Sequence, residues 1–396
     1  MWRAGFFFHE MAFGLLSVFI PIYVIVTLGG TLLEVGIMTA VALFLTIPAS
    51  FFWGYACDKT RRYKRFILLS FLSMAILLYL FTLTSSISLL IILYAVISIF
   101  HSAHEAPKNV LIAESYPREQ WEKAFALYEG YTEAGWLIGL LLGFFVSAYN
   151  VSSSSTLLLC SGLNLMAFVL SLIFVVDPLL IFERSLVTIE RTLDFAHKGV
   201  FVASKMLDGL ALDEKLRKEN LTAFCGGLVL FSLATSILFT PLPLFFSQNL
   251  ALPTSVVFAI YVLNSGGGVV SYLLASGRYQ RHEAYPPIGK IVILRSLLSF
   301  LLIATMEVRE FGVLLPVAIL ILMGSANALF VIFTLTLSME LVPAGKAGLF
   351  NVLIGVGAAF GSFAGPSIAQ IIGFTSVFAV AGAIFLAAFV SFKLFA

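Results

Sequence analysis

Charged residues are scarce in this sequence: they make up 11% of its 396 residues, whereas a soluble domain carries about 25%. Hydrophobic residues make up 60% of the chain, and its mean hydropathy is +1.05. A single water-soluble core of this size cannot enclose so much apolar surface. The scarcity of charge therefore excludes an ordinary soluble domain and indicates that the outer surface of the protein faces lipid.

Other features are missing as well. The sequence has no Gly-x-x-x-x-Gly-Lys-Ser/Thr motif, so we expect no ATP-driven work. Its three cysteines, Cys57, Cys160 and Cys225, lack the spacing of metal ligands and are expected to be small core residues. The first apolar run, 5–28, is longer than the roughly 7–15 apolar residues of a cleavable signal peptide, so we expect none. The net charge of +2 gives no indication of a nucleic-acid partner, and we expect neither that nor a cofactor.

Twelve apolar runs are long enough to cross a bilayer as helices, which takes about 20 residues. They are expected at 5–28, 33–56, 66–84, 88–112, 122–149, 155–176, 221–246, 254–276, 288–306, 312–338, 347–371 and 374–395. Thr31 and Glu34 have the spacing of a capping box that begins the second helix. Pro253 and Thr254 are expected to begin the eighth. The predicted fold is therefore an all-α polytopic membrane protein.

Lysine and arginine gather in the loops on one side of these spans. The loops on the other side contain only Arg309. Cytoplasmic loops carry the excess of basic residues, so we expect both termini in the cytoplasm and the protein in the plasma membrane as a multi-pass protein. The basic residues of the cytoplasmic loops outside the long central stretch are Lys59, Arg61, Arg62, Lys64, Arg65, Arg118, Lys123, Arg278, Arg281, Lys290 and Lys346.

One long polar stretch, 177–220, interrupts the apolar runs. Between Leu186 and Leu207 its apolar residues recur at alternating steps of three and four, which is typical of an amphipathic helix lying on the membrane surface. The stretch divides the chain into an N-terminal six-helix bundle, 1–176, a cytoplasmic linker, 177–220, and a C-terminal six-helix bundle, 221–396. A tether between the bundles is a better explanation of the linker than a regulatory site.

The two bundles resemble each other in sequence. In each, a Glu-x-x-Pro element after the fourth span precedes a helix with three glycines spaced four apart. The elements begin at Glu114 and Glu340, and the triplets are Gly135, Gly139 and Gly143, and Gly357, Gly361 and Gly365. The elements are 226 residues apart and the triplets 222 apart, so an indel of four residues reconciles them. Parallel repeats of this kind are a transporter architecture with the substrate site between the halves.

Small residues spaced four apart allow helix backbones to approach closely. Packing inside one bundle explains any single glycine triplet equally well. Their occurrence at matching places in both halves favours the moving interface between the bundles, which is where we expect them. The glycine-rich stretch 264–268 of the eighth helix is a candidate partner surface.

The loop after the second span resembles the Gly-x-x-x-Asp-Arg/Lys-x-Gly-Arg-Arg/Lys motif of the major facilitator superfamily. Four residues match, Gly54, Asp58, Lys59 and Arg62, whereas Arg61 and Tyr63 depart from the motif. The stretch from Glu114 to Pro117 is similar to the family's pattern after the fourth helix. The resemblance covers the whole chain and implies two six-helix bundles that form a transporter.

The resemblance also implies a conformational latch. Asp58 would face the N-terminal end of the eleventh helix near Gly348, and Arg62 would pair with Glu114. These bonds would hold the halves together on the cytoplasmic side when the outer gate is open. The equivalent loop of the second half, 277–281, has lost the acidic residue.

Charged groups inside the membrane are concentrated in the first half. Each costs about 2.5–3.5 kcal/mol at mid-bilayer on insertion scales, so a function is the default hypothesis. The residues are His9, Glu10, His101, His104, Glu105, Glu129 and Glu133. His101 and Glu105 are four apart and share a helix face, as do Glu129 and Glu133. We expect Glu10, His101, Glu105, Glu129 and Glu133 to bind substrate or couple protons.

Simpler explanations exist for each of these groups. An ion pair with Lys108 would absorb the charge of Glu105, Glu129 lies near the cytoplasmic edge, and His9 and Glu10 fit the interface. His101, His104 and Glu105 offer the ligand types of a divalent metal, but on a regular α-helix they point too far apart to meet at one ion. No metal site is therefore expected. An intramembrane zinc hydrolase needs His-Glu-x-x-His, and Phe13 stands where the second histidine belongs, so no catalytic residue is expected.

The second half is nearly uncharged within its spans. Arg295 lies about two turns from the cytoplasmic end of the ninth helix and is expected to reach the interface. Asn264, Asn327 and Asn351 are the expected polar lining. No arginine lies between positions 88 and 113, where many proton-driven exporters of the resembled family carry one, which weakens an efflux role.

The function expected from the sequence is that of a monomeric secondary transporter with alternating access. The first, fourth, seventh and tenth helices would line its cavity. A small amphipathic or cationic solute is expected, with proton coupling. The alternatives are a facilitated-diffusion permease, a divalent-metal transporter and, from other classes, an intramembrane enzyme or a transporter-like sensor or scaffold.

Overall fold

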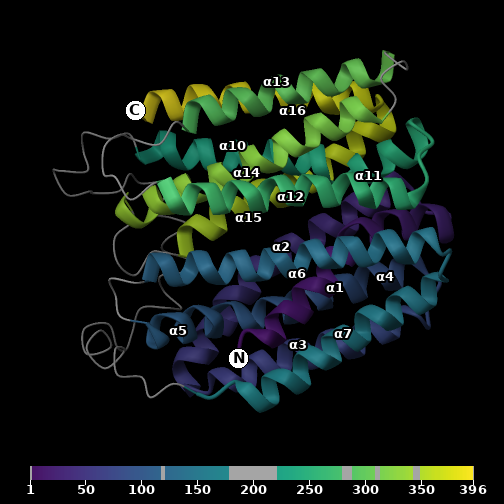
Figure 1. Cartoon of the computed structure of the whole chain (residues 1–396). Coiled ribbons are helices and arrows are strands. Elements are labelled where there is room, and N and C mark those ends of the chain that lie inside the picture. Colours follow the sequence, from purple (N-terminus) through teal and green to yellow (C-terminus); the bar gives the residue numbers. More distant parts are fainter. Residues whose placement is uncertain are drawn as a thin grey trace.

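The computed structural model describes residues 2–116, 121–177, 221–278, 288–307, 313–341 and 348–395. Within these residues, twelve helical segments are long and apolar enough to cross a membrane. They lie side by side along one common direction (Figure 1). The expected all-helical polytopic fold is thereby confirmed.

The first half of the chain contains six of these spans. They are formed by α1 (Ala4–Ile22) with its π-helical continuation η1 (Tyr23–Thr27), α2 (Leu32–Thr60), α3 (Tyr63–Phe81), α4 (Ile87–His101) with η2 (Ser102–His104) and α5 (Glu105–Ser115), α6 (Trp121–Ala148) and α7 (Ser153–Phe174). The capping box is confirmed, because the Thr31 hydroxyl accepts from the Glu34 amide and the Glu34 carboxylate accepts from the Thr31 amide.

The second half contains the other six. They are formed by α10 (Leu221–Phe239) with α11 (Leu242–Leu244) and the π-helical η5 (Phe245–Asn249), α12 (Thr254–Arg278), α13 (Ile288–Glu307), α14 (Leu314–Leu341), α15 (Gly348–Ile371) and α16 (Phe374–Phe395). The eighth span begins at Thr254, as Pro253 led us to expect.

Both termini lie at the same end of the molecule (Figure 1), which we call the terminal end. The junction of α1 and α2 at residues 28–31 lies at the opposite end. The expected amphipathic helix between Leu186 and Leu207 lies outside the described residues. Asp177, the first residue of the expected linker, accepts a hydrogen bond of 2.7 Å from the Lys64 amide at the start of α3.

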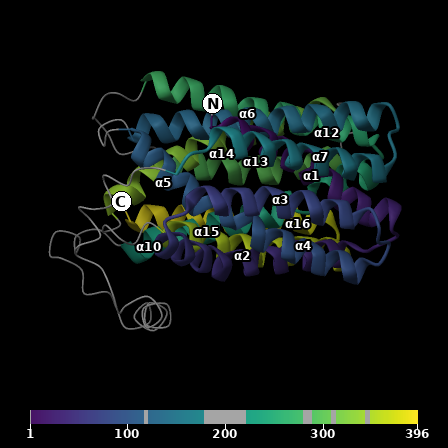
Figure 2. The same cartoon turned by 90° about the horizontal axis from the view of Figure 1, so that it is seen from below.

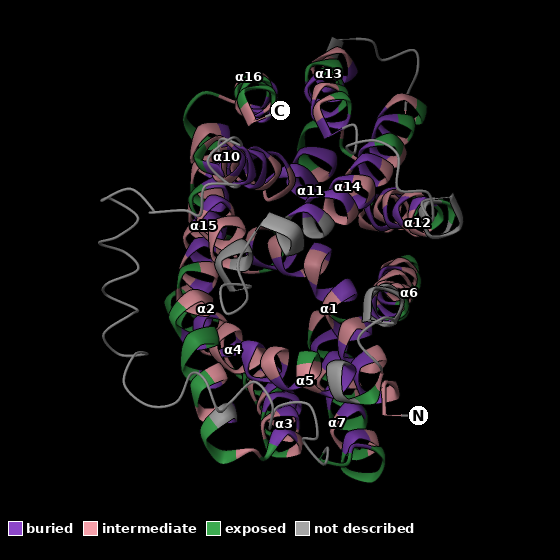
Figure 3. Ribbon diagram, turned by 90° about the vertical axis from the view of Figure 1, so that its left-hand side faces the viewer, coloured by how far each residue is buried: buried purple, intermediate pink, exposed green. Residues whose placement is uncertain are grey.

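Seen from the terminal end, α1 to α7 form one group of helices and α10 to α16 another (Figure 3). Two helix pairs join the groups, α2 with α15 and α6 with α12. The views in Figures 2 and 3 agree that these pairs lie on opposite flanks of the molecule. At the opposite end α1 also contacts α11.

The two groups repeat the same internal packing. In the first, Gly135 and Gly139 of α6 lie against the carbonyl oxygens of Phe7 and Met11 on α1. In the second, Gly357 and Gly361 of α15 lie against those of Val229 and Leu233 on α10. All four residues of the second set follow their counterparts by 222 positions, the offset that the sequence gives for the glycine triplets. The repeat thus preserves individual backbone contacts.

This packing corrects the expectation that the triplets join the two bundles. Gly135, Gly139, Gly357, Gly361 and Gly365 all abut a helix of their own half. Of the six, Gly143 lies against the other half, at the ring of Phe258 on α12. The physical reason is that a carbonyl oxygen of the neighbouring helix lies 2.0–2.6 Å from where a Cβ would stand, so glycine is what lets these helix pairs within one half pack this closely.

The cores of the two halves merge only towards the opposite end. One cluster of buried residues there takes members from both halves, among them Tyr23, Val24, Leu244 and Phe246. Towards the terminal end, the buried residues around Phe6 and Phe71 belong to the first half and those around Phe224 and Phe330 to the second. In the described part of the chain the halves therefore close against each other at the opposite end and have separate cores at the terminal end.

Candidate functional site

A cavity of about 210 Å³ lies where α6 of the first half faces the second half. Glu133 of α6 lines it, together with residues of α10, α12, α13 and α14. The polar or charged residues on its wall include Thr235, Asn264, Ser265, Tyr272, Arg295 and Asn327. We call this space the central cavity.

Arg295 is fully buried beside the central cavity, with 0% of its side chain exposed. Its guanidinium lies over the rings of Phe231, Phe239 and Phe385 at 5.0–5.5 Å. The expectation that Arg295 reaches the membrane interface is therefore wrong. Its side chain points into the second half because α10 and α16 supply an aromatic wall that holds the cation within the bundle.

The guanidinium of Arg295 has more hydrogen-bond donors than the described residues accept from. Nη1 donates to Asn327 Oδ1 at 2.6 Å. Nε and Nη2 have no hydrogen-bond partner among the described residues. Buried polar groups are nearly always bonded, and a planar guanidinium edge matches the two oxygens of a carboxylate. An unsatisfied edge beside a cavity is therefore what an anionic ligand group would fill.

The carboxylate of Glu133 lies on the other side of the same cavity. It accepts a hydrogen bond of 3.2 Å from Ser265 on α12. Asn264, the neighbour of Ser265, donates to the carbonyl of Leu320 on α14 at 2.7 Å. Asn264 thus fixes the packing of α12 against α14 and leaves Ser265 facing the first half.

The lining differs from what the sequence led us to expect. The residues around the central cavity come from the fifth, seventh, eighth, ninth and tenth spans. None of these lining residues belongs to the first or the fourth span. A smaller, mainly apolar cavity of about 80 Å³ lies between α1, α3, α4 and α6. Asn264 and Asn327 line the central cavity, whereas the side chain of Asn351 lies outside the described residues.

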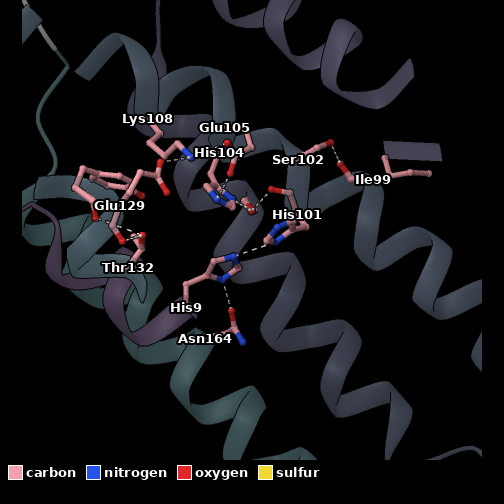
Figure 4. Close-up of polar contacts among 12 residues, drawn as sticks. His9, Ile99, His101, Ser102, His104, Glu105, Lys108, Glu129, Thr132 and Asn164 are labelled. Carbon is pink, nitrogen blue, oxygen red and sulfur yellow. Dashed lines mark hydrogen bonds and ion pairs between the residues drawn. The ribbon is translucent and has the colours of Figure 1, made fainter. Parts of the chain in front are cut away.

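Three imidazoles meet in the first half (Figure 4). One ring nitrogen from each of His9, His101 and His104 lies within 4.8 Å of the other two. His9 Nε2 is 3.1 Å from His101 Nδ1, and the two rings are stacked. We call these three residues the His cluster. The sequence led us to expect that His101, His104 and Glu105 would not all converge on one ion; in the structure His101 and His104 do meet, and His9 joins them.

The reason is a break in the fourth span. Pro107 has no amide proton, and its ring clashes with the carbonyl of the residue four positions earlier, which is Ala103. The helix passes through this point as a 3₁₀ turn, Ser102–His104. A 3₁₀ helix has 3.0 residues per turn, so residues three apart lie on the same side. His101 and His104 therefore point together.

The same break changes the partners of Glu105. Its two carboxylate oxygens lie 3.2 Å from His104 Nε2 and 2.6 Å from Lys108 Nζ. The expected pairing with His101 does not occur, whereas the ion pair with Lys108 does. Lys108 Nζ also lies 3.9 Å from Glu129 Oε1. The side chain of Lys108 is 12% exposed, whereas that of Glu129 is 51% exposed.

The other candidate acids do not share one partner. Glu129 turns to Lys108 in its own half, while Glu133 turns to Ser265 in the other, although both are on the same helix. Glu10 is half-buried on α1, next to Gly135 of α6.

The latch expected at the terminal end is only partly described. The side chains of Asp58 and Glu114 lie outside the described residues, and the Arg62 side chain is exposed. No described atom lies within 4 Å of where a Cβ on Gly54 would stand, so Gly54 does not mark a close helix approach in this conformation. The latch is expected to form when the outer gate is open. In this structure the halves meet at the opposite end, so a formed latch is not expected here.

Several residues of these sites escaped sequence reasoning. Asn164 and Ser70 bond to the His cluster, and Ser265 bonds to Glu133. Pro107 was the available signal for the break that aligns two histidines. Nothing local distinguishes Ser70, Asn164 or Ser265 from other polar residues in apolar helices, because their partners belong to distant spans.

Comparison with known proteins agrees with this architecture. A family model described as Major Facilitator Superfamily matches residues 4–351. None of the curated proteins compared with the chain matches it.

Solved structures of similar fold are transporters. The nucleoside transporter NupG is 14% identical, with a TM-score of 0.70 over 100% of this chain and 98% of that one. A POT family transporter in complex with 5-aminolevulinic acid is 12% identical, with a TM-score of 0.76 over 100% and 95%. A bacterial homolog of the human lysosomal transporter Spinster, in an inward-facing and occupied conformation, is 12% identical, with a TM-score of 0.69 over 99% and 95%.

Proposed function

This chain belongs to the Major Facilitator Superfamily, and we propose that it is a secondary transporter that moves a small solute by alternating access through the central cavity. The observation that carries the proposal is the position of Glu133. It belongs to the first half, yet it lines a cavity whose other walls belong to the second half. A ligand bound there contacts both halves and so senses their relative position. The transporters of similar fold support this class of function over an enzyme.

The core of the protein supports alternating access. The halves share one buried cluster at the opposite end and have separate clusters at the terminal end. This is the arrangement of a transporter open towards the terminal end. The excess of lysine and arginine in the loops of that end favours the cytoplasmic side and the plasma membrane. We expect the two bundles to rock about the α2–α15 and α6–α12 contacts in a monomer.

The charges on the cavity wall define a substrate class. Glu133 suits a cationic group, in line with the cationic solute expected from the sequence. Arg295 adds an unsatisfied guanidinium edge, which suits a carboxylate. The best-matched solute is therefore a small zwitterion that carries an ammonium and a carboxylate.

Glu133 is also the best candidate for proton coupling. Its bond to Ser265 crosses between the halves, so a change in its protonation changes a contact that holds them. The charged or titratable groups around it are Glu129 on its own helix, Glu10 on α1, Tyr272 on α12 and Arg295 on α13. A substrate ammonium and a proton would compete for Glu133, which is a simple basis for exchange.

The test uses the full chain purified and reconstituted in liposomes. Thermal stabilisation by a panel of small cationic, anionic and zwitterionic solutes of matched size identifies ligands. Uptake of each ligand is then measured with and without an imposed pH gradient. We expect zwitterions to stabilise the protein most and a pH gradient to drive their accumulation. Equal uptake without a gradient would favour a facilitated-diffusion permease, and no uptake of any ligand that binds would favour a sensor.

A further inference from the structure

None of the residues of the His cluster lines the central cavity, and the cluster has the construction of a ligand site. His9 and His104 are 0% and 1% exposed, and His101 is partly buried. The rings of Phe13 and Phe71 pack against His101 and His9 at 4.4 and 4.6 Å. Three imidazoles gathered in an apolar shell contribute little packing that apolar aromatic rings could not supply, so packing alone does not account for their convergence.

Polar neighbours fix the orientation of the imidazoles. Asn164 donates through Nδ2 to the carbonyl of Cys160, which leaves its Oδ1 as the acceptor, 2.7 Å from His9 Nδ1. His9 therefore carries its proton on Nδ1 and offers a lone pair on Nε2. That lone pair faces His101 Nδ1 at 3.1 Å. Ligand histidines in metal sites are held in this way, by a bond from the ring nitrogen that is not coordinated.

His104 is held by the same device. Its Nδ1 lies 3.1 Å from the hydroxyl of Ser70. Its Nε2 is buried and has no hydrogen-bond partner among the described residues. Oε1 of Glu105 lies 3.2 Å from it, which is an ion-pair distance. A buried ring nitrogen without a hydrogen bond, beside two other imidazoles and one carboxylate oxygen, has the surroundings of an unfilled metal coordination shell.

We propose that His9, His101 and His104 bind a divalent transition-metal ion of the zinc class, with Glu105 as the fourth ligand. Imidazole and carboxylate are ligand types of Zn²⁺, Co²⁺ and Ni²⁺. Zinc sits about 2.0–2.1 Å from imidazole nitrogens. Ring nitrogens within 4.8 Å of one another reach that geometry by small rotations of the side chains. Glu105, which is 41% exposed, provides the path by which the ion enters.

The bound ion joins two spans of the first half. It ties α1 to the 3₁₀ break in the fourth span, and Glu105 extends the tie to Lys108. Metal binding displaces the proton shared by His9 and His101. None of the four proposed ligands lines the central cavity, so metal binding is tested without a transport assay.

The test uses full-length protein purified with an affinity tag that contains no histidine and stripped with a chelator. Co²⁺ is added, and its visible absorption bands report the number and type of ligands; competition with Zn²⁺ then gives the zinc affinity. We expect one ion per chain, absorption bands of four-coordinate cobalt, and a rise in the midpoint of thermal unfolding.

Two variants separate binding from folding. His101→Gln removes the most accessible imidazole and is expected to weaken Co²⁺ binding roughly tenfold or more. His101→Cys should restore binding and add a sulfur-to-cobalt charge-transfer band. His282→Gln, which removes a histidine outside the cluster, should change nothing. The proposal is overturned if His101→Gln elutes as a folded monomer and binds Co²⁺ as tightly as the His282→Gln control.

Discussion

Ser265 on α12 donates a hydrogen bond of 3.2 Å to the carboxylate of Glu133 on α6, and this bond joins the two halves of the molecule. Both residues line the cavity that also contains Arg295. A membrane-buried carboxylate, a bond between halves and a cavity therefore coincide at one place. The substrate site and the moving contact are close enough to influence each other directly.

Glu133→Gln keeps the shape and a hydrogen-bond acceptor for Ser265 but removes the charge. A charge-assisted hydrogen bond contributes about 1.5–3 kcal/mol, so loss of the charge should weaken binding of an ammonium-bearing solute roughly ten- to hundredfold. Accumulation driven by a pH gradient should disappear, while exchange of solute across the membrane should persist. Uptake into liposomes with and without a gradient measures both.

Glu129→Gln is the matched control, because Glu129 is on the same helix but turns to Lys108. It should retain uptake driven by a pH gradient. If both variants keep gradient-driven uptake, Glu133 is not the coupling residue.

Arg295→Lys preserves the charge but not the planar pair of donors. A carboxylate-bearing solute should therefore bind about tenfold more weakly, which corresponds to the loss of roughly one hydrogen bond. A solute without a carboxylate should bind unchanged. Binding is measured by thermal shift or calorimetry with two solutes that differ only in the carboxylate.

Lys290→Gln provides the control on α13, because Lys290 is exposed at the start of that helix. Equal losses for both solutes in Arg295→Lys would mean that Arg295 supports the bundle and does not touch the substrate.

Gly139→Ala tests the repeated packing of the two halves. A Cβ at this position would stand 2.0 Å from the carbonyl oxygen of Met11, so the backbones must separate. Overpacking of this kind costs about 1–3 kcal/mol, and the midpoint of thermal unfolding should fall. In Gly361→Ala the added Cβ would stand 2.4 Å from the carbonyl oxygen of Leu233, so the midpoint of thermal unfolding should fall in this variant as well.

Gly130 is the control for the glycine series. It lies on α6 with no described atom within 4 Å of an added Cβ. Gly130→Ala should leave the midpoint unchanged or raise it, since alanine favours helix over glycine by up to about 1 kcal/mol. An equal fall in all three variants would contradict a specific close contact.

Pro107→Ala tests the cause of the 3₁₀ turn. Alanine restores the amide donor to the carbonyl of Ala103, so the fourth span should become a continuous α-helix. His104 would then be rotated by about 60° around the helix axis relative to His101, so the two imidazoles would lose their alignment and Co²⁺ binding to the His cluster should weaken roughly tenfold or more. Unchanged binding in a folded Pro107→Ala protein would show that other packing holds the turn.

Cross-linking tests the alternation of the two ends. The Leu33 amide donates to the side-chain oxygen of Gln370 at 2.7 Å, which joins the start of α2 to the end of α15. In a variant without Cys57, Cys160 and Cys225, cysteines at 33 and 370 joined by a short bifunctional reagent should stop uptake, and a reducible reagent should allow recovery. Leu33→Cys alone is the control. Full uptake in the cross-linked protein would contradict an opening of the two halves at this end.

The sequence alone determined the twelve spans, the start of α2 at its capping box and the existence of a repeat. These features are local, because a run of about 20 apolar residues suffices for a span and a capping box acts over four residues. The offset of 222 between the glycine triplets likewise needed no structure, and the packing of Gly139 on Met11 and Gly361 on Leu233 has that same offset.

Only the tertiary structure decided which way the side chains face. Arg295 was expected at the membrane edge and lies buried against Asn327. A position of His9 at the interface was one explanation that the sequence left open, and in the structure His9 meets His101 and His104. In a soluble helix, alternation of polar and apolar residues indicates the buried face. In a bilayer the lipid-facing and core-facing surfaces are both apolar, so the sequence does not carry that information, and helix rotation is set by contacts with distant spans.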